Sequence, residues 1–135
     1  MSDRVFLDSN ILLYVYSDSE PLKRNICKSV ISENNCCTST QALNELSNVC
    51  TKKWNISRNS IEDAIDEICS VCEIIQINEG TIKKGLYLHE KYRYAYYDCL
   101  MLASALESEC KEIFTEDMQN GQVIENVLTI LNIFK

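Results

Sequence analysis

Glycine and proline are scarce in this sequence, which has three glycines and one proline among 135 residues. The pair accounts for roughly 12% of an average protein. Folds that depend on many tight turns, such as β-sandwiches and β-barrels, are therefore disfavoured. We expect a chain rich in helix, and three isolated glycines cannot build the loops of dinucleotide or P-loop nucleotide sites.

Long hydrophobic runs are also missing. The longest apolar stretch, residues 11–16, is far shorter than the roughly 20 residues of a membrane-spanning helix. The N-terminus begins with Ser2, Asp3 and Arg4 rather than with an export signal. We therefore expect a soluble, cytoplasmic protein that has no membrane partner.

Basic residues are fewer than acidic ones, 13 against 20, and the formal net charge is −7. This balance argues against non-specific binding of a polyanion such as nucleic acid. Any activity on nucleic acid would need local basic groups, a metal ion or a basic partner.

Cysteine, in contrast, is abundant, with eight residues. In a chain with a full-sized core and no export signal, we expect reduced thiols that pack mostly as small hydrophobes. The one C-x-x-C pair, Cys69 and Cys72, closes a predicted helix, whereas redox pairs open one. No second pair has the spacing of a zinc site, so core packing is favoured over metal or redox use.

Strands alternate with helices along the whole chain. The first helix is expected to be capped near Ser9 or Asn10, and the capping-box sequence 38–41 is expected to open the third. We place strands at residues 4–8, 36–38, 73–77, 113–115 and 127–134, and helices at 9–16, 21–33, 42–53, 57–72, 79–92 and 96–109. The alternation predicts an α/β fold, a three-layer α/β/α sandwich around a mostly parallel sheet, in one domain of residues 1–135.

Two acidic residues lie where predicted strands end. Asp8 ends the first strand, and Asp117 comes two residues after Thr115. Carboxyl ends of parallel strands meet at one edge of a sheet, where open α/β folds bind ligands. Each residue also has a structural alternative, because Asp8 could cap the next helix and Asp117 could serve a turn.

Two further acids lie on the apolar sides of predicted helices. Glu45 comes three residues after Ala42 and four before Val49, so it shares their stripe. Asp98 comes three residues before Met101 and shares its apolar side. The alternatives are a residue at the rim of the stripe for Glu45 and a favourable charge at a helix start for Asp98.

Together, the four acids predict a cation site. Clustered carboxylates raise one another's pKa, so such a cluster needs a positive charge among its members. Ligand sets made of oxygen suit hard ions such as Mg²⁺ or Mn²⁺, which also hold phosphates.

Four stretches in this order, residues 5–12, 43–46, 97–105 and 114–121, resemble the PIN domain family, most closely its VapC-type toxin ribonucleases. The resemblance covers essentially the whole chain. It implies a Mg²⁺- or Mn²⁺-dependent endoribonuclease that cleaves RNA, is often a homodimer and is inhibited by a cognate antitoxin in a type II toxin-antitoxin pair. By motif match, the catalytic residues and metal ligands would be Asp8, Glu45, Asp98 and Asp117, supported by Asn10 and Thr115.

Two features depart from the family pattern. Residues 132–134 are Asn-Ile-Phe where similar family members often have Asn-Pro-Phe. Glu116 lies beside Asp117 and is an alternative fourth ligand; Asp117 is preferred because it lies two residues after Thr115.

Basic and aromatic residues offer candidate RNA contacts. Lys83, Lys84 and Arg93 are candidates to hold the RNA backbone, as are Lys52 and Lys53. Candidate stacking residues for unpaired bases are Tyr94, Tyr96 and Tyr97. The alternative for each lysine or arginine is solvated surface charge, and for each tyrosine it is core packing.

Other chemistries are less favoured. The only histidine, His89, shares a predicted helix side with Ile82 and Leu86, which favours a structural role over a general base. Asp8 could be the nucleophile of an aspartyl-phosphate phosphatase, but that family has a second Asp where this chain has Asn10. The main rival is a catalytically silent PIN-like module that binds RNA or protein, and it gives no reason to keep clustered acids.

Overall fold

The computed structural model describes residues 3–135 and contains one central sheet. Within these residues the strands are β1 (Arg4–Leu7), β2 (Asn35–Ser39), β3 (Glu73–Ile75), β4 (Glu112–Phe114), β5 (Val123–Ile124) and β6 (Leu128–Leu131). They lie in the order β3-β2-β1-β4-β6-β5. Every neighbouring pair is parallel except β5 and β6, so the predicted mostly parallel sheet is confirmed.

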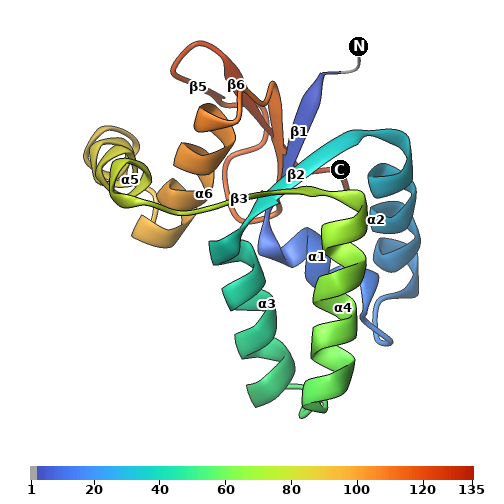
Figure 1. Ribbon diagram of the computed structural model, residues 1–135. Coiled ribbons are helices and arrows are strands. Elements are labelled where there is room, and N and C mark those ends of the chain that lie inside the picture. The colour runs from blue at the N-terminus through green and yellow to red at the C-terminus, as the bar shows by residue number, and fades with distance from the viewer. Residues whose placement is uncertain (1–2) are drawn as a thin grey trace.

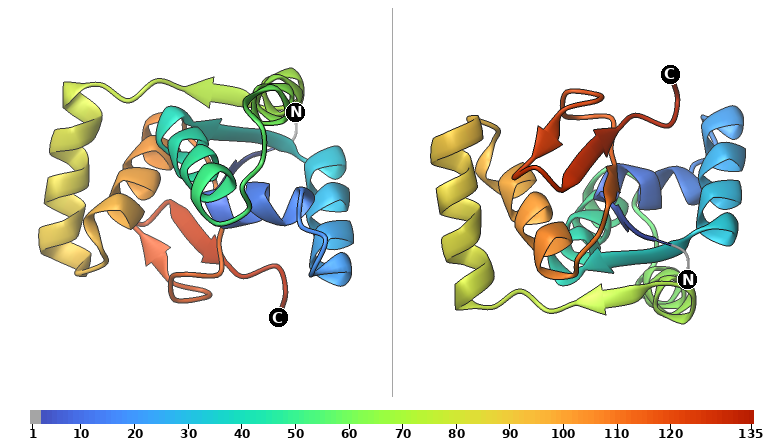
Figure 2. Two further views of the ribbon diagram at one scale, coloured as in Figure 1. Left: turned by 90° about the horizontal axis from the view of Figure 1, so that it is seen from below. Right: turned by 90° about the horizontal axis from the view of Figure 1, so that it is seen from above.

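Helices flank this sheet on both sides. They are α1 (Ser9–Val15), α2 (Pro21–Glu33), α3 (Thr40–Lys52), α4 (Arg58–Val71), α5 (Glu79–Tyr92) and α6 (Tyr96–Glu107). Figure 2 shows α5 and α6 on one side of the sheet and α1 and α2 on the other. The α/β class is thus confirmed, and among the residues described no helix is long and apolar enough to cross a membrane.

The core is built around β1 and α6. Val5, Phe6 and Leu7 are buried on the central strand, and α6 is buried at every position from Cys99 to Ala105. A helix that is apolar all round needs cover on every side, and α6 lies between the sheet and α5 (Figures 1 and 2). Packing against the sheet and α5 therefore fixes the position of α6, which carries Asp98 in its first turn.

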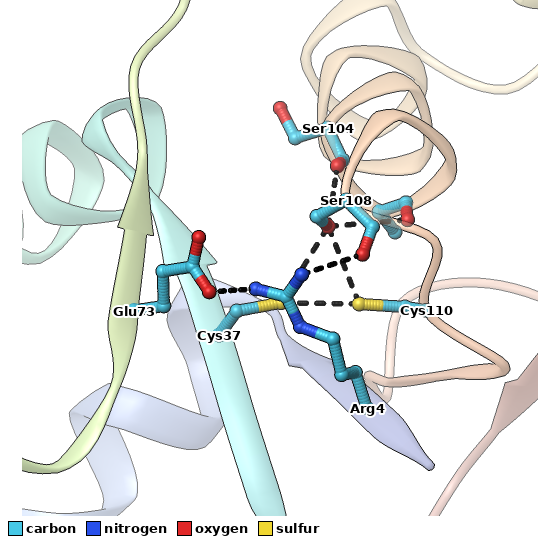
Figure 3. A network of polar contacts seen from close by, with 7 residues as sticks. Arg4, Cys37, Glu73, Ser104, Ser108 and Cys110 are labelled. Carbon is cyan, nitrogen blue, oxygen red and sulfur yellow. Dashed lines mark hydrogen bonds and ion pairs between the residues drawn. The ribbon is translucent and has the colours of Figure 1, made fainter.

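Arg4 links β1 to β3 and to the segment that follows α6, next to two buried thiols. Its guanidinium bonds Glu73 on β3 and donates to the carbonyl of Ser108, which follows α6, at 2.9 Å (Figure 3). Beneath it, the Sγ atoms of Cys37 and Cys110 lie 3.0 Å apart. Seven cysteines are buried and pack in the core as predicted, whereas Cys69 is exposed.

The predicted strand at residues 127–134 is wrong in extent. The pairing covers only β6, and a short antiparallel partner, β5, precedes it. Glu125 and Asn126 connect them with φ angles of 52° and 63°, and Val127 donates its backbone N–H to the carbonyl of Ile124. Two successive positive φ angles define the tight hairpin turn that matches strand twist. Glu is rare at a position with positive φ, so no clear signal in the sequence marks a turn at Glu125.

Two predicted caps are displaced. Asp8 itself caps α1, by accepting from Ser9 N at 2.7 Å. Ser39 caps α3, by accepting from Ala42 N. Thr38 lies inside the sheet, where its hydroxyl donates to the carbonyl of Leu7 at 2.7 Å, so it is not free to start a capping box.

The side of α5 that carries Ile82 and Leu86 is the exposed one. Ile82 and Leu86 are 41% and 54% exposed, whereas Thr81, Gly85 and Leu88 are buried. Gly85 faces Leu100 of α6, and a Cβ there would lie 3.4 Å from a side-chain carbon of Leu100, at ordinary contact distance. The buried stripe contains smaller and more polar residues than the exposed one. The spacing of hydrophobic residues alone therefore does not identify the buried side of this helix.

Candidate functional site

Asp8 lies at the carboxyl end of β1 and is almost fully buried. Its Oδ1 accepts from Ser9 N at 2.7 Å, and its Oδ2 accepts from the hydroxyl of Thr115 at 2.7 Å. Burial raises the pKa of Asp8 to about 7 even though both hydrogen bonds lower it, and the charges of Glu45 and Asp117 raise it further. A carboxylate is thus held in a place that disfavours its own charge.

Asp117 follows the neighbouring strand β4 and is fixed by the same hydroxyl group. Its backbone N–H donates to Thr115 Oγ1 at 3.1 Å, and its Oδ2 accepts from Asn10 Nδ2 at 2.9 Å. Because β1 and β4 are parallel and paired from Val5–Glu112 to Leu7–Phe114, their carboxyl ends lie side by side. Thr115 and Asn10 therefore link the two carboxylates through hydrogen bonds.

Asp98 comes from the first turn of α6 and is only partly exposed. Burial raises the pKa of Asp98 to about 6, and the nearby charges of Asp117 and Glu45 add to the effect. Among the described residues, its carboxylate has no hydrogen-bond donor to offset that cost. The other three predicted acids each accept at least one side-chain or backbone hydrogen bond.

The structure brings three of the four predicted acids together. One carboxylate oxygen each from Asp8, Asp98 and Asp117 can be chosen so that all lie within 4.8 Å of one another. Such a set of oxygen ligands fits a hard divalent cation such as Mg²⁺ or Mn²⁺. We refer to these three residues as the acidic triad.

Glu45 lies outside the acidic triad but close to it. Its Oε1 accepts from the hydroxyl of Ser9 at 2.8 Å, and its Oε2 accepts from Gln41 Nε2 at 3.1 Å. Its charge raises the pKa of both Asp8 and Asp98. Ser9 and Gln41 were missed by the sequence analysis, although Ser9 adjoins Asp8 and Gln41 precedes Glu45 by one helical turn.

Glu116 points away from the acidic triad into a cluster of its own. Its carboxylate accepts from Lys23 Nζ at 2.9 Å and from the hydroxyl of Tyr14. Burial alone would raise the pKa of Glu116, but the bonds from Tyr14 and Lys23 lower it on balance. With both oxygens engaged, Glu116 is a poor substitute for Asp117 as a ligand, and no sequence signal marked Lys23 as its partner.

The basic candidates lie in two places: Lys83 and Lys84 are on α5 and Arg93 follows it, whereas Lys52 and Lys53 are at the end of α3. Lys84 forms a long ion pair with Glu125 at 3.8 Å. Lys83 and Arg93 are exposed and make no ion pair within residues 3–135. His89 is exposed and its Nδ1 bonds the carbonyl of Tyr94 at 2.6 Å, which supports the structural role expected for it.

Comparisons with known proteins agree with this architecture. A family model described as PIN domain matches residues 5–122. No curated protein matches the sequence significantly.

Solved structures with a similar fold have low sequence identity. A chain of a toxin-antitoxin complex from Klebsiella pneumoniae superimposes with a TM-score of 0.72 at 20% identity, over 97% of this chain and 98% of that one. A chain of VapBC2 from Rickettsia felis, bound to a promoter DNA fragment, gives 0.65 at 19% identity, over 96% and 99%. VapC20 of Mycobacterium tuberculosis, a toxin that cleaves the sarcin-ricin loop, gives 0.64 at 12% identity, over 81% and 86%.

Proposed function

The chain belongs to the PIN domain family, and from this premise we propose that it is a metal-dependent endoribonuclease that hydrolyses RNA phosphodiester bonds. The observation that carries the proposal is the acidic triad, whose three carboxylate oxygens lie within 4.8 Å of one another. The matched family region, residues 5–122, includes all three residues. We further propose that the protein is the toxin of a type II toxin-antitoxin pair.

In this proposal the acidic triad holds Mg²⁺ or Mn²⁺. An ion held by these residues would supply a Lewis acid for the scissile phosphate and would make water a better nucleophile. Thr115 and Asn10 keep the carboxylates of Asp8 and Asp117 oriented through their hydrogen bonds. Glu45, fixed by Ser9 and Gln41, acts at the edge of the site through water.

The rival function is a catalytically silent module that binds RNA or protein. The energetic state of the triad argues for the nuclease, because burial raises the pKa of both Asp8 and Asp98. A silent module would become more stable by losing either charge. A role in cation binding explains why the chain keeps a destabilising cluster.

The first experiment is cleavage of a mixed, structured RNA pool by the purified protein with Mg²⁺, with Mn²⁺ and with chelator. We expect metal-dependent cuts that are reduced at least 100-fold in Asp8→Asn. Asp63→Asn is the matched control, because Asp63 is an exposed acid on α4, and it should cut like wild type. Cleavage that survives both chelator and Asp8→Asn would refute the proposed site; the absence of cleavage by folded protein would favour the silent module.

Glu116 and Asp117 are expected to differ sharply. Asp117→Asn removes a carboxylate of the acidic triad and should reduce cleavage at least 100-fold. Glu116→Gln should retain cleavage within a few-fold, because Glu116 is engaged by Lys23 and Tyr14. Initial rates at saturating Mg²⁺ for the two variants test this, and a Glu116→Gln variant as inactive as Asp117→Asn would reassign the ligand.

We propose an antitoxin and a second copy of the chain as protein partners. The antitoxin is supported by the similar structures, whose descriptions include a toxin-antitoxin complex and VapBC2. The homodimer is supported by the family resemblance and by exposed apolar residues on α5, Ile82 and Leu86. Light scattering of the purified chain measures the dimer, and loss of cleavage on adding the product of an adjacent small reading frame tests the antitoxin.

A further inference from the structure

An open cavity lies beside Glu45, between α3 and the start of α6, and four of its five lining residues have amide or carboxylate side chains. It has a volume of about 350 Å³ and is lined by Gln41, Asn44, Glu45, Asn48 and Tyr97. This volume lies within the roughly 300–1,000 Å³ range of small-ligand pockets. Glu45, which lines the cavity, accepts a hydrogen bond from Ser9, the residue that follows Asp8, so the cavity lies beside the acidic triad.

The lining of the cavity is rich in carboxamides. Gln41, Asn44 and Asn48 lie at positions three and four residues apart on α3, so they form one stripe along the helix. The side-chain Nε2 of Gln41 donates a hydrogen bond to Glu45. The side-chain oxygen of Gln41 is left available to accept a hydrogen bond from a ligand. Asn44 and Asn48 are exposed, and their side chains make no hydrogen bond within residues 3–135. The stripe thus presents donors and acceptors to a ligand.

Tyr97 provides an aromatic surface at the mouth of the cavity. It is 59% exposed, and its ring packs edge-on against Tyr96 with a centroid distance of 5.4 Å. Tyr96 in turn lies near Gly85 of α5, so the neighbouring ring is anchored in the helix pair. A large exposed ring with a fixed neighbour offers a stacking surface at low entropic cost.

The charge of the cavity decides which part of an RNA it suits. No lysine or arginine lines it, and its one ionisable acid is Glu45, so a phosphate group would be repelled. Carboxamides match the donor and acceptor pattern of a base edge. Exposed aromatic rings stack on unpaired bases.

We propose that this cavity binds an unpaired nucleobase of the RNA, next to the phosphate held at the acidic triad. The inference rests on the proposed function and adds to it a base-binding subsite. Tyr97 stacks on the base, and Asn44 and Asn48 hydrogen-bond its edge. This subsite would give the enzyme its preference for single-stranded RNA and for particular bases at the cut.

A binding measurement tests the subsite independently of cleavage. The side-chain amide signals of Asn44 and Asn48, assigned with Asn44→Ala and Asn48→Ala, are followed by NMR in chelator during titration with adenosine, guanosine, cytidine and uridine to low-millimolar concentrations, since these probes carry no phosphate. Ribose is the control that lacks a base. We expect shifts with at least one nucleoside and none with ribose; equal shifts with both, or no shift with any nucleoside, would overturn the proposal.

Cleavage by variants provides the second test. Tyr97→Ala should lower kcat/KM on an unstructured RNA about tenfold, whereas Tyr97→Phe keeps the ring and the activity. The double variant Asn44→Ala, Asn48→Ala should lower the discrimination between preferred and disfavoured bases about tenfold. The matched controls are Tyr87→Ala and Asn59→Ala, which alter exposed residues outside the cavity.

The two proposals fail in different ways. If wild-type protein cuts RNA but the cavity variants keep both rate and base preference, the subsite is wrong and the nuclease stands. If wild-type protein does not cut, the nuclease is wrong, and the amide shifts still decide whether the cavity binds a base.

Discussion

Asp98→Asn is expected to abolish RNA cleavage and at the same time to stabilise the metal-free protein at pH 8. Cleavage should fall at least 100-fold, because one of three carboxylates of the acidic triad is lost. Stability should rise by about 1–2 kcal/mol, a value reduced from the full pKa difference because Asp98 is partly exposed. No hydrogen bond to Asp98 within residues 3–135 offsets the gain. Chemical denaturation in chelator measures the stability change.

Asp63→Asn serves again as the control for this experiment. It removes an exposed carboxylate from α4 and should change neither cleavage nor stability by more than about 0.5 kcal/mol. An Asp98→Asn protein that is less stable than wild type at pH 8 would show that the carboxylate is not strained by burial and repulsion. Full retention of cleavage would remove Asp98 from the site.

The stability of the metal-free protein is expected to fall as pH rises from about 4 to about 7. In the folded protein the pKa of Asp8 is about 7 and that of Asp98 about 6, both above the ordinary value of 3.8. Between the ordinary and the raised pKa, the folded state binds more protons than the unfolded state, so the free energy of unfolding declines with pH. For Asp8 the loss is on the order of 4 kcal/mol, and it is complete above about pH 7.

Comparison with a variant that lacks the carboxylates of Asp8 and Asp98 separates their effect on stability from that of other titrating groups. Denaturation curves at several pH values in chelator are measured for wild type and for the double variant Asp8→Asn, Asp98→Asn. The difference in unfolding free energy between the two proteins should change by several kcal/mol across the window. A difference that is independent of pH would contradict the raised pKa values.

A divalent cation should restore the stability that the protein loses as the pH rises. At pH 8, above the pKa of both groups, Asp8 and Asp98 are mostly charged, so Mg²⁺ should bind the folded state and raise Tm. At pH 5 Asp8 and Asp98 are mostly protonated, and the same concentration of Mg²⁺ should have much less effect. Thermal unfolding with matched ionic strength, set by KCl, tests this, and equal stabilisation at both pH values would argue against the triad as the binding site.

Several features of the site were predictable because they depend on local pattern. Asp8 and Asp117 follow β1 and β4, and parallel strands bring their carboxyl ends to one edge. Asp98, in the first turn of α6, directly precedes the buried segment Cys99–Ala105, and its position on the apolar side of this helix marked it as unusual. These three residues form the acidic triad.

Other features depended on contacts between distant residues. The sequence analysis predicted Glu45 as a metal ligand on the same footing as the three acids of the triad. In the structure its carboxylate lies outside the triad and accepts hydrogen bonds from Ser9 and Gln41. The choice between Glu116 and Asp117 follows from Lys23, which reaches Glu116 from 93 residues away in the sequence. Hydrophobic spacing shows which residues share a helix face but cannot say which partner that face meets.

The sequence by itself determined the α/β class, a mostly parallel sheet and the four acids from which the triad is drawn. These follow from periodicity and from the direction of parallel strands, which are properties of short segments. Only the tertiary structure decided the inner side of α5, the β5–β6 hairpin, and the cavity of Tyr97 and the α3 carboxamides. Each of these is set by what another element offers for packing or hydrogen bonding, for which the chain has no local signal.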